Sequence, residues 1–160
     1  MLDWLAQTSL AIWVSQSAGW PLALTIHAFG SATMVGLFFI IGLRLLGLFE
    51  TIPFKSLSKL LPYAWVSLVL QAASGFLLLL TKPAQYLADA MFDVKFSLVI
   101  IASVVTWYFQ GALKREAAAW QAAGTVTSRG IKFGAATTLL WAAVLIGGRL
   151  TAYLGSLYPT

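Results

Sequence analysis

The chain has 160 residues, of which 60% are apolar and 9% are charged, with a net charge of +5 and no cysteine. The apolar residues gather in long blocks, which is typical of a helical integral membrane protein with one domain. These blocks are continuous rather than alternating, which excludes a lipid-facing β-barrel. The lack of cysteine excludes disulfides, thiolate metal sites and cysteine nucleophiles. The basic residues lie mainly between the blocks, so membrane topology explains them and no nucleic acid partner is expected.

The first apolar segment, about residues 2–14, is too short to span a bilayer. Its amino end carries Asp3, where a secretory signal would carry Lys or Arg. We therefore expect a short helix that lies in the membrane interface, with Trp4, Trp13 and Trp20 at the level of the lipid headgroups.

Four longer apolar segments follow, and each is long enough to cross the hydrocarbon at a rise of about 1.5 Å per residue. We expect the spans at about residues 20–48, 60–81, 92–113 and 133–155. Stretches with proline or basic residues separate them. Residues 81–93 are expected to form a polar turn, and the basic, Ala-rich connection at residues 114–132 is expected to be helical in its first half. No internal repeat is evident. The sequence therefore predicts an all-α integral membrane four-helix bundle, a single domain over residues 1–160 with a short interfacial helix at its amino end.

The basic residues also predict an orientation. Seven of the ten lie in or beside the loops after the first and third spans: Arg44, Lys55, Lys59, Lys114, Arg115, Arg129 and Lys132. Lys82, Lys95 and Arg149 lie toward the other side. The positive-inside rule places the first set in the cytoplasm, with Arg44 snorkelling to headgroup phosphates. We expect a multi-pass protein of the bacterial inner membrane with both termini in the periplasm.

His27, the single histidine, lies about two turns inside the first span. An ionisable side chain at that depth costs a few kcal/mol unless it has a partner, so it predicts a functional site or an interhelical hydrogen bond. Each span has one polar or small face, and the groups on these faces nearest the outer surface are expected to line one outward-facing pocket. The predicted cofactor-binding residues are His27, Ser31, Met34, Gln71, Ser74, Lys95 and Arg149.

Three kinds of ligand suit a histidine with nearby cations. The first is haem b, with His27 as the ligand of the iron and the propionates facing Lys95 and Arg149. The second is a quinone, whose carbonyl oxygens would accept hydrogen bonds from the same groups. The third is another metal, with Met34 as a second ligand. Met34 also suits packing, and Lys95 near its helix end also suits snorkelling.

Small residues recur at helical spacing in two spans, where they predict close helix packing. The two series are Ala28, Ala32 and Gly36, and Ala143, Gly147, Thr151 and Gly155. No nucleophile elbow, phosphate-binding loop or HExxH motif occurs, and the carboxylates lie at span edges or in loops. The pattern argues against a hydrolase and leaves other enzymatic activity open.

Several segments resemble an uncharacterised family of four-span bacterial inner-membrane proteins: TIHAFGSATMVGLFFIIGLRLLGL, LLPYAWVSLVLQAASGFLLLL, AMFDVKFSLVIIAS and WAAVLIGGRLTAY. The resemblance implies a four-span fold and brings no assigned activity. Members often carry acidic residues where this chain has Leu24 and Leu43. More distantly, the chain is similar to copper-resistance D-type proteins and to haem-binding membrane protoporphyrinogen oxidases. Those oxidases use more than one histidine, so a bis-histidine haem here would need a homodimer.

The sequence therefore predicts a membrane haem- or quinone-binding protein with a redox role, in which His27 holds the cofactor in the outer half of the bundle. A redox partner subunit or a second copy is an expected partner besides the lipid bilayer. The alternatives are an accessory subunit whose polar groups merely hold helices together, and a small transporter for metal or porphyrin.

Overall fold

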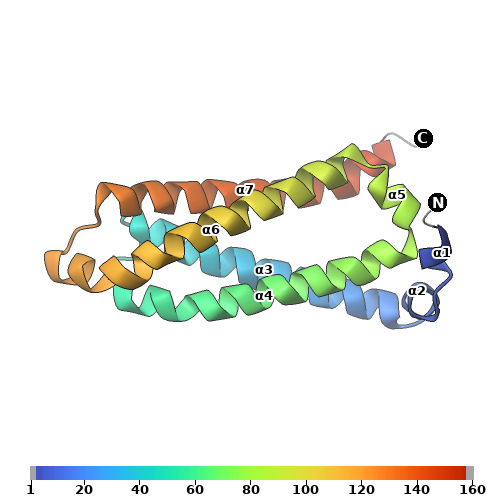
Figure 1. The fold of residues 1–160 in the computed structure, drawn as a ribbon, viewed down its shortest axis with the longest axis horizontal. Coiled ribbons are helices and arrows are strands. Elements are labelled where there is room, and N and C mark those ends of the chain that lie inside the picture. The colour runs from blue at the N-terminus through green and yellow to red at the C-terminus, as the bar shows by residue number, and fades with distance from the viewer. Residues whose placement is uncertain (1–2, 158–160) are drawn as a thin grey trace.

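The computed structural model describes residues 3–157, with side chains described up to Leu150. The chain is helical along almost its whole described length and contains no strand there. Two short helices precede the bundle, and a third joins its second and third long helices (Figure 1). The helices are α1 (Asp3–Ala6), α2 (Ser9–Gln16), α3 (Gly19–Leu45), α4 (Phe54–Thr81), α5 (Pro83–Leu87), α6 (Ala90–Ala123) and α7 (Ser128–Leu157).

Four helices, α3, α4, α6 and α7, are long and apolar enough to cross a membrane. Many large apolar side chains on them point outward, among them Phe29, Val69 and Leu139, each 66–70% exposed. An apolar surface around a whole bundle is unfavourable in water and favourable in lipid. The protein is therefore an all-α membrane protein with four spans, as the sequence predicts.

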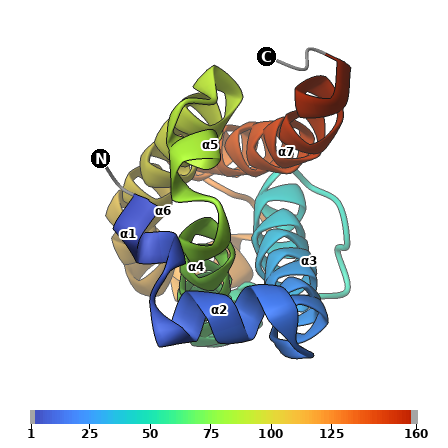
Figure 2. The ribbon, with the colours of Figure 1, turned by 90° about the vertical axis from the view of Figure 1, so that its right-hand side faces the viewer.

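The four helices run up and down in chain order around the bundle axis (Figures 1 and 2). Helix α3 packs against α4 and α7, and α6 packs against the same two helices. The backbones of the diagonal pairs, α3 with α6 and α4 with α7, do not approach each other closely within the described residues. Short connections force this antiparallel order, because each helix must return beside the one before it.

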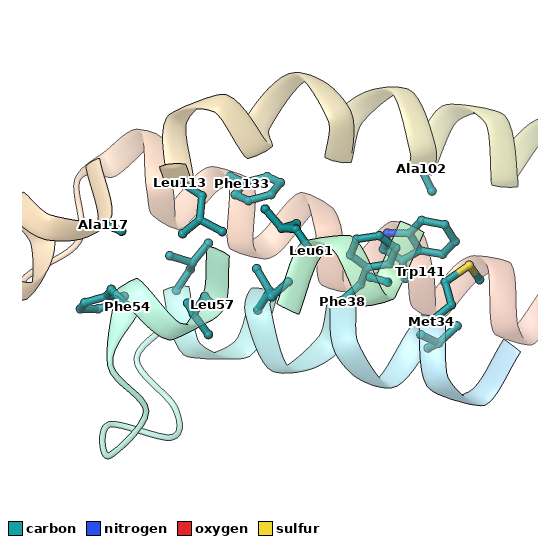
Figure 3. Packing of buried hydrophobic residues seen from close by; sticks show 14 of the residues in the cluster. Met34, Phe38, Phe54, Leu57, Leu61, Ala102, Leu113, Ala117, Phe133 and Trp141 are labelled. Atoms are coloured by element: carbon teal, nitrogen blue, oxygen red, sulfur yellow. The ribbon is translucent and has the colours of Figure 1, made fainter. Parts of the chain in front are cut away.

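The packed core fills the half of the bundle nearest the α3–α4 and α6–α7 loops (Figure 3). Phe38 stacks on Trp141 with ring centroids 4.6 Å apart, and Trp65 meets Phe38 edge-on at 5.9 Å. The indole Nε1 of Trp141 donates a hydrogen bond of 3.1 Å to the buried Thr106 hydroxyl. Phe38, Trp65 and Trp141 thus join three helices and fix their register.

The expected interfacial segment, about residues 2–14, forms α1 and α2, and residue 2 lies outside the described part. Helix α2 lies across the end of the bundle, over α3 and α4 (Figure 2). Thr8 caps it by accepting a hydrogen bond from the Ala11 amide. Gly19 permits the sharp turn into α3, because a Cβ there would lie 2.7 Å from the Val14 backbone.

Three helices extend beyond the predicted spans at the loop end. Helix α4 begins at Phe54 instead of about residue 60, and α7 begins at Ser128 instead of about residue 133. Helix α6 continues past residue 113 to Ala123, which agrees with the helix expected in the first half of the connection after that span. In these extensions the apolar periodicity gives way to mixed residues that still favour a helix. The Phe54 amide donates to Gln121 Oε1 at 2.9 Å, which ties the extensions of α4 and α6 together.

The prediction that Arg44 snorkels to headgroup phosphates was wrong. Its side chain is 8% exposed and donates hydrogen bonds to the carbonyls of Ile52, at 2.8 Å, and Glu50, at 3.3 Å. The guanidinium also lies 4.0 Å from the centre of the Phe54 ring. Unpaired loop carbonyls next to the membrane attract a buried donor, so Arg44 holds the α3–α4 loop against the bundle.

The packing predicted along Ala28, Ala32 and Gly36 is not made within the described bundle. Ala28 and Ala32 are exposed, and a Cβ at Gly36 would meet nothing within 4 Å. The close contacts lie on another face of α3, at Gly30 and Gly42. In the second series Gly147 is buried against Leu98, whereas the surroundings of Thr151 and Gly155 lie outside the described part.

Candidate functional site

His27 lies two turns into α3 and is half-buried against α4. Its Nδ1 lies 3.1 Å from the carbonyl oxygen of Gln71, and its Nε2 lies 3.0 Å from the side-chain Nε2 of the same residue. Nδ1 also lies 3.2 Å from Ser74 Oγ. Gln71 therefore engages both ring nitrogens at once.

These contacts define the tautomer of the ring. A carbonyl oxygen can only accept, so Nδ1 carries the proton and donates to Gln71. Nε2 then accepts from the Gln71 amide. The Ser74 hydroxyl donates to the Leu70 carbonyl at 2.7 Å, so its oxygen is available to Nδ1 as a second acceptor. His27 is thus a neutral imidazole with both nitrogens satisfied.

Two glycines make room for this arrangement. A Cβ at Gly75 would lie 3.0 Å from His27 Cε1, so a side chain there would push the ring away. A Cβ at Gly30 would lie 3.2 Å from the Gln71 backbone nitrogen. Gly30 therefore lets α3 approach α4 closely enough for His27 to reach Gln71.

The imidazole borders a cavity of about 520 Å³ in the half of the bundle opposite the packed core. Five helices contribute to its wall, which is mostly apolar and aromatic with four polar side chains. The lining residues are Leu24, His27, Leu68, Gln71, Ala72, Gly75, Phe76, Leu78, Leu79, Tyr86, Phe92, Lys95, Phe96, Val99 and Gly148. We call this space the His27 cavity.

Lys95 enters the His27 cavity from α6. Its side chain is half-buried beside Gly148 of α7, where a Cβ would lie 3.6 Å from Lys95 Cε. In the described part of the chain the ammonium has no hydrogen bond or ion pair, so it is available to a ligand with an oxygen acceptor.

The His27 cavity opens toward lipid between α4 and α6. Phe76 and Phe96 line it and are nevertheless 57% and 59% exposed at the bundle surface. Tyr86 on α5 forms part of the wall near the membrane surface. Burial raises the pKa of the Tyr86 phenol above its usual value, so this hydroxyl keeps its proton at neutral pH and can donate a hydrogen bond.

One polar atom at the cavity has no partner. Gln71 Oε1 is buried and accepts no hydrogen bond within the described residues. Such an orphan acceptor costs about 1–3 kcal/mol, and because almost none of its surface is exposed, a donor in the cavity reaches it only if the Gln71 side chain turns.

The structure brings only some of the seven predicted site residues to the cavity. His27, Gln71 and Lys95 line it, whereas Ser74 contacts the His27 ring without lining the cavity. Ser31 is half-buried and outside the lining, and Met34 is 1% exposed within the packed core. Arg149 is exposed and does not line the cavity, although its neighbour Gly148 does.

Sequence reasoning missed Tyr86 and the aromatic wall. Tyr86 belongs to a segment that the sequence indicated as a polar turn, and the structure folds that segment into α5. Phe92 contacts it, with ring centroids 6.0 Å apart. Lys82–Pro83 is a helix-start signal, with proline at the first position, and it would have indicated α5.

The donor set suits some ligands better than others. No group of three His, Cys, Asp or Glu side chains that could hold a metal occurs among the described residues. For haem, His27 Nε2 would first have to release the Gln71 amide, and of the two predicted propionate partners only Lys95 lines the cavity. A ligand that needs hydrogen-bond donors fits without any such rearrangement.

Comparisons of the chain with protein families, curated proteins and solved structures find no match. The family resemblance suggested by the sequence therefore stays a prediction. The candidate function has to be argued from the site itself.

Proposed function

We propose that the protein binds the head group of a membrane-soluble quinone in the His27 cavity and takes part in electron transfer. One observation carries the proposal: a mostly apolar cavity that opens to lipid and holds His27, Gln71, Tyr86 and Lys95 together. Ligand sites combine an apolar lining with a few convergent polar groups in this way. An isoprenoid tail would leave between α4 and α6, beside Phe76 and Phe96.

The polar groups match the chemistry of a quinone. Its carbonyl oxygens accept hydrogen bonds, and the Lys95 ammonium and the Tyr86 hydroxyl are donors on the cavity wall. After reduction the head group carries hydroxyls, which could donate to Gln71 Oε1 only if the Gln71 side chain turns, because that atom has almost no exposed surface in this structure. Quinone reduction takes up two electrons and two protons, and a redox partner subunit would exchange the electrons.

Two other functions remain in competition. Haem b ligated by His27 requires that Gln71 turn away from Nε2. An accessory role, in which His27 only holds α3 to α4, is favoured by the fact that both ring nitrogens already have partners. Both alternatives predict that a quinone head group has no specific affinity for the cavity.

Equilibrium binding of short-chain ubiquinone and menaquinone analogues to the purified protein tests the proposal. Lys95→Gln removes one positive charge from the cavity, and Arg149→Gln removes one outside it. We expect Lys95→Gln to weaken binding about tenfold, the usual effect of losing a hydrogen bond to a charged group, and Arg149→Gln to leave it unchanged.

The absence of saturable binding, or an equal loss in both variants, would contradict a quinone site. A Soret band in protein from haem-replete cells that disappears in His27→Ala would favour haem instead. If the purified wild type retains neither haem nor quinone, and His27→Ala has a folding defect, the accessory role would be favoured.

A further inference from the structure

A second cavity lies at the other end of the bundle, and the proposed quinone site does not involve it. Its volume is about 510 Å³, and it is bounded by α6 and the start of α7. Three basic and two large aromatic side chains dominate its wall. The lining residues are Trp107, Tyr108, Gln110, Gly111, Lys114, Arg115 and Arg129. We call it the basic groove.

The basic groove has positive charge without compensation. None of its three basic side chains, Lys114, Arg115 and Arg129, makes a hydrogen bond or ion pair within the described residues. The nearest carboxylate in sequence, Glu116, accepts a hydrogen bond from Thr127 at 3.1 Å and does not line the groove. Three cations brought together without a counter-charge attract an anion.

Side-chain positions in the groove also favour an anionic ligand. Gly111 leaves space beside the α6 backbone, and the Arg115 guanidinium occupies this space. A Cβ at Gly111 would lie only 3.2 Å from Arg115 Nη1. Gln110 uses its Oε1 to accept from Trp65 Nε1 at 3.1 Å, so its remaining amide group is a donor without a protein partner. Every polar group that the groove still has available, apart from the Tyr108 hydroxyl, can only donate.

The position along α6 identifies the kind of anion. From Val94 to Leu113 the helix is mainly apolar, with Lys95 as its one charged residue, and rises about 29 Å, the thickness of the hydrocarbon layer. Lys114 and Arg115 follow directly and so lie at headgroup depth. Trp107 and Tyr108, which are 66% and 63% exposed, lie below them at the depth of the acyl carbonyls.

We propose that the basic groove binds the headgroup phosphate of an anionic phospholipid between α6 and α7. Arg115 and Arg129 hold the phosphate from two helices, Lys114 adds charge, and the acyl chains lie along Trp107 and Tyr108. An anionic lipid fits better than a zwitterionic one, because it brings a net negative charge to a site that lacks one. The bound lipid would also join the two helices at their loop end.

Native mass spectrometry of the full chain released from mixed phosphatidylglycerol and phosphatidylcholine membranes tests this site. The wild type is expected to retain phosphatidylglycerol in preference. Arg115→Gln together with Arg129→Gln should weaken retention about fivefold for each arginine removed. The control is Lys55→Gln with Lys59→Gln, which removes the same charge from exposed positions at the same end of the bundle, outside the groove.

Unchanged retention in the arginine pair would overturn the proposal, and so would an equal loss in the lysine pair, which would indicate charge alone. Competition by millimolar inorganic phosphate would show a site for free phosphate instead of lipid, and would likewise overturn it. If the arginine variant misfolds, Trp107→Leu serves as the second variant, and it should lower retention while the far-ultraviolet circular dichroism stays unchanged. Quinone affinity is measured in the same samples and should not change.

Discussion

At the scale of single residues, His27 and Gln71 act as one unit, because Gln71 contacts both nitrogens of the ring. Replacing His27 leaves the Gln71 amide without an acceptor, and replacing Gln71 leaves Nε2 without a donor. Their effects on stability should therefore not add. Hydrogen bonds between membrane helices contribute about 0.6 kcal/mol on average and up to about 1.7 kcal/mol.

We predict a coupling of about 1 kcal/mol between His27→Leu and Gln71→Leu in the free energy of unfolding, measured in mixed micelles with increasing dodecyl sulfate. The control pair is His27→Leu with Gln110→Leu. Gln110 bonds Trp65 near the other end of the bundle, so this pair should be additive within about 0.5 kcal/mol. Additivity in the first pair would show that the bond between the Gln71 amide and His27 Nε2 contributes nothing to folding; the bond from Nδ1 to the Gln71 backbone carbonyl is not tested, because Gln71→Leu keeps that carbonyl.

The sequence indicated His27, Gln71 and Lys95 because polar groups within apolar spans are costly and need partners. It could not separate them from Arg149, since a step of one residue, about 100° around the helix, decides whether a side chain faces the cavity or the lipid. Met34 shows the same limit, because its spacing from His27 suits a ligand and its position in the core suits packing. Tyr86 was missed because its helix has only five residues.

At the scale of helices, two glycines of α3 have opposite surroundings. A Cβ at Gly42 would collide with the Thr138 hydroxyl and would lie 3.0 Å from the Gly134 carbonyl oxygen on α7. A Cβ at Gly36 would meet nothing within 4 Å. Both glycines lie in the same helix, so replacing either by alanine brings the same gain in helix propensity. A difference in stability between the two variants therefore measures the effect of packing alone.

We predict that Gly42→Ala destabilises the bundle by about 1–3 kcal/mol, because α3 and α7 must move apart. Gly36→Ala should be neutral or stabilising by up to about 1 kcal/mol. Unfolding in mixed micelles measures both. A loss of stability in Gly36→Ala would mean that this face packs against another chain.

At the scale of the whole molecule, hydrophobic length predicted the number of spans, since only helices of about twenty apolar residues satisfy their backbone in lipid. The ends of helices were harder to predict. Helices α4 and α7 begin about six and five residues before the predicted spans, in segments where no membrane limits their length. The cavities could not be predicted, because they depend on where large side chains of the core give way to small ones.

The orientation of the bundle remains a prediction that the chain itself makes easy to test. It has no cysteine, so a single introduced cysteine is the only target for a maleimide. Thr125 in the α6–α7 loop and Gln85 on α5 are both exposed and lie at opposite ends of the bundle (Figure 1). If the basic end faces the cytoplasm, a membrane-impermeant maleimide should label Gln85→Cys in intact cells and Thr125→Cys only after permeabilisation. The reverse pattern would place the basic groove on the outer face and the His27 cavity nearer the cytoplasm.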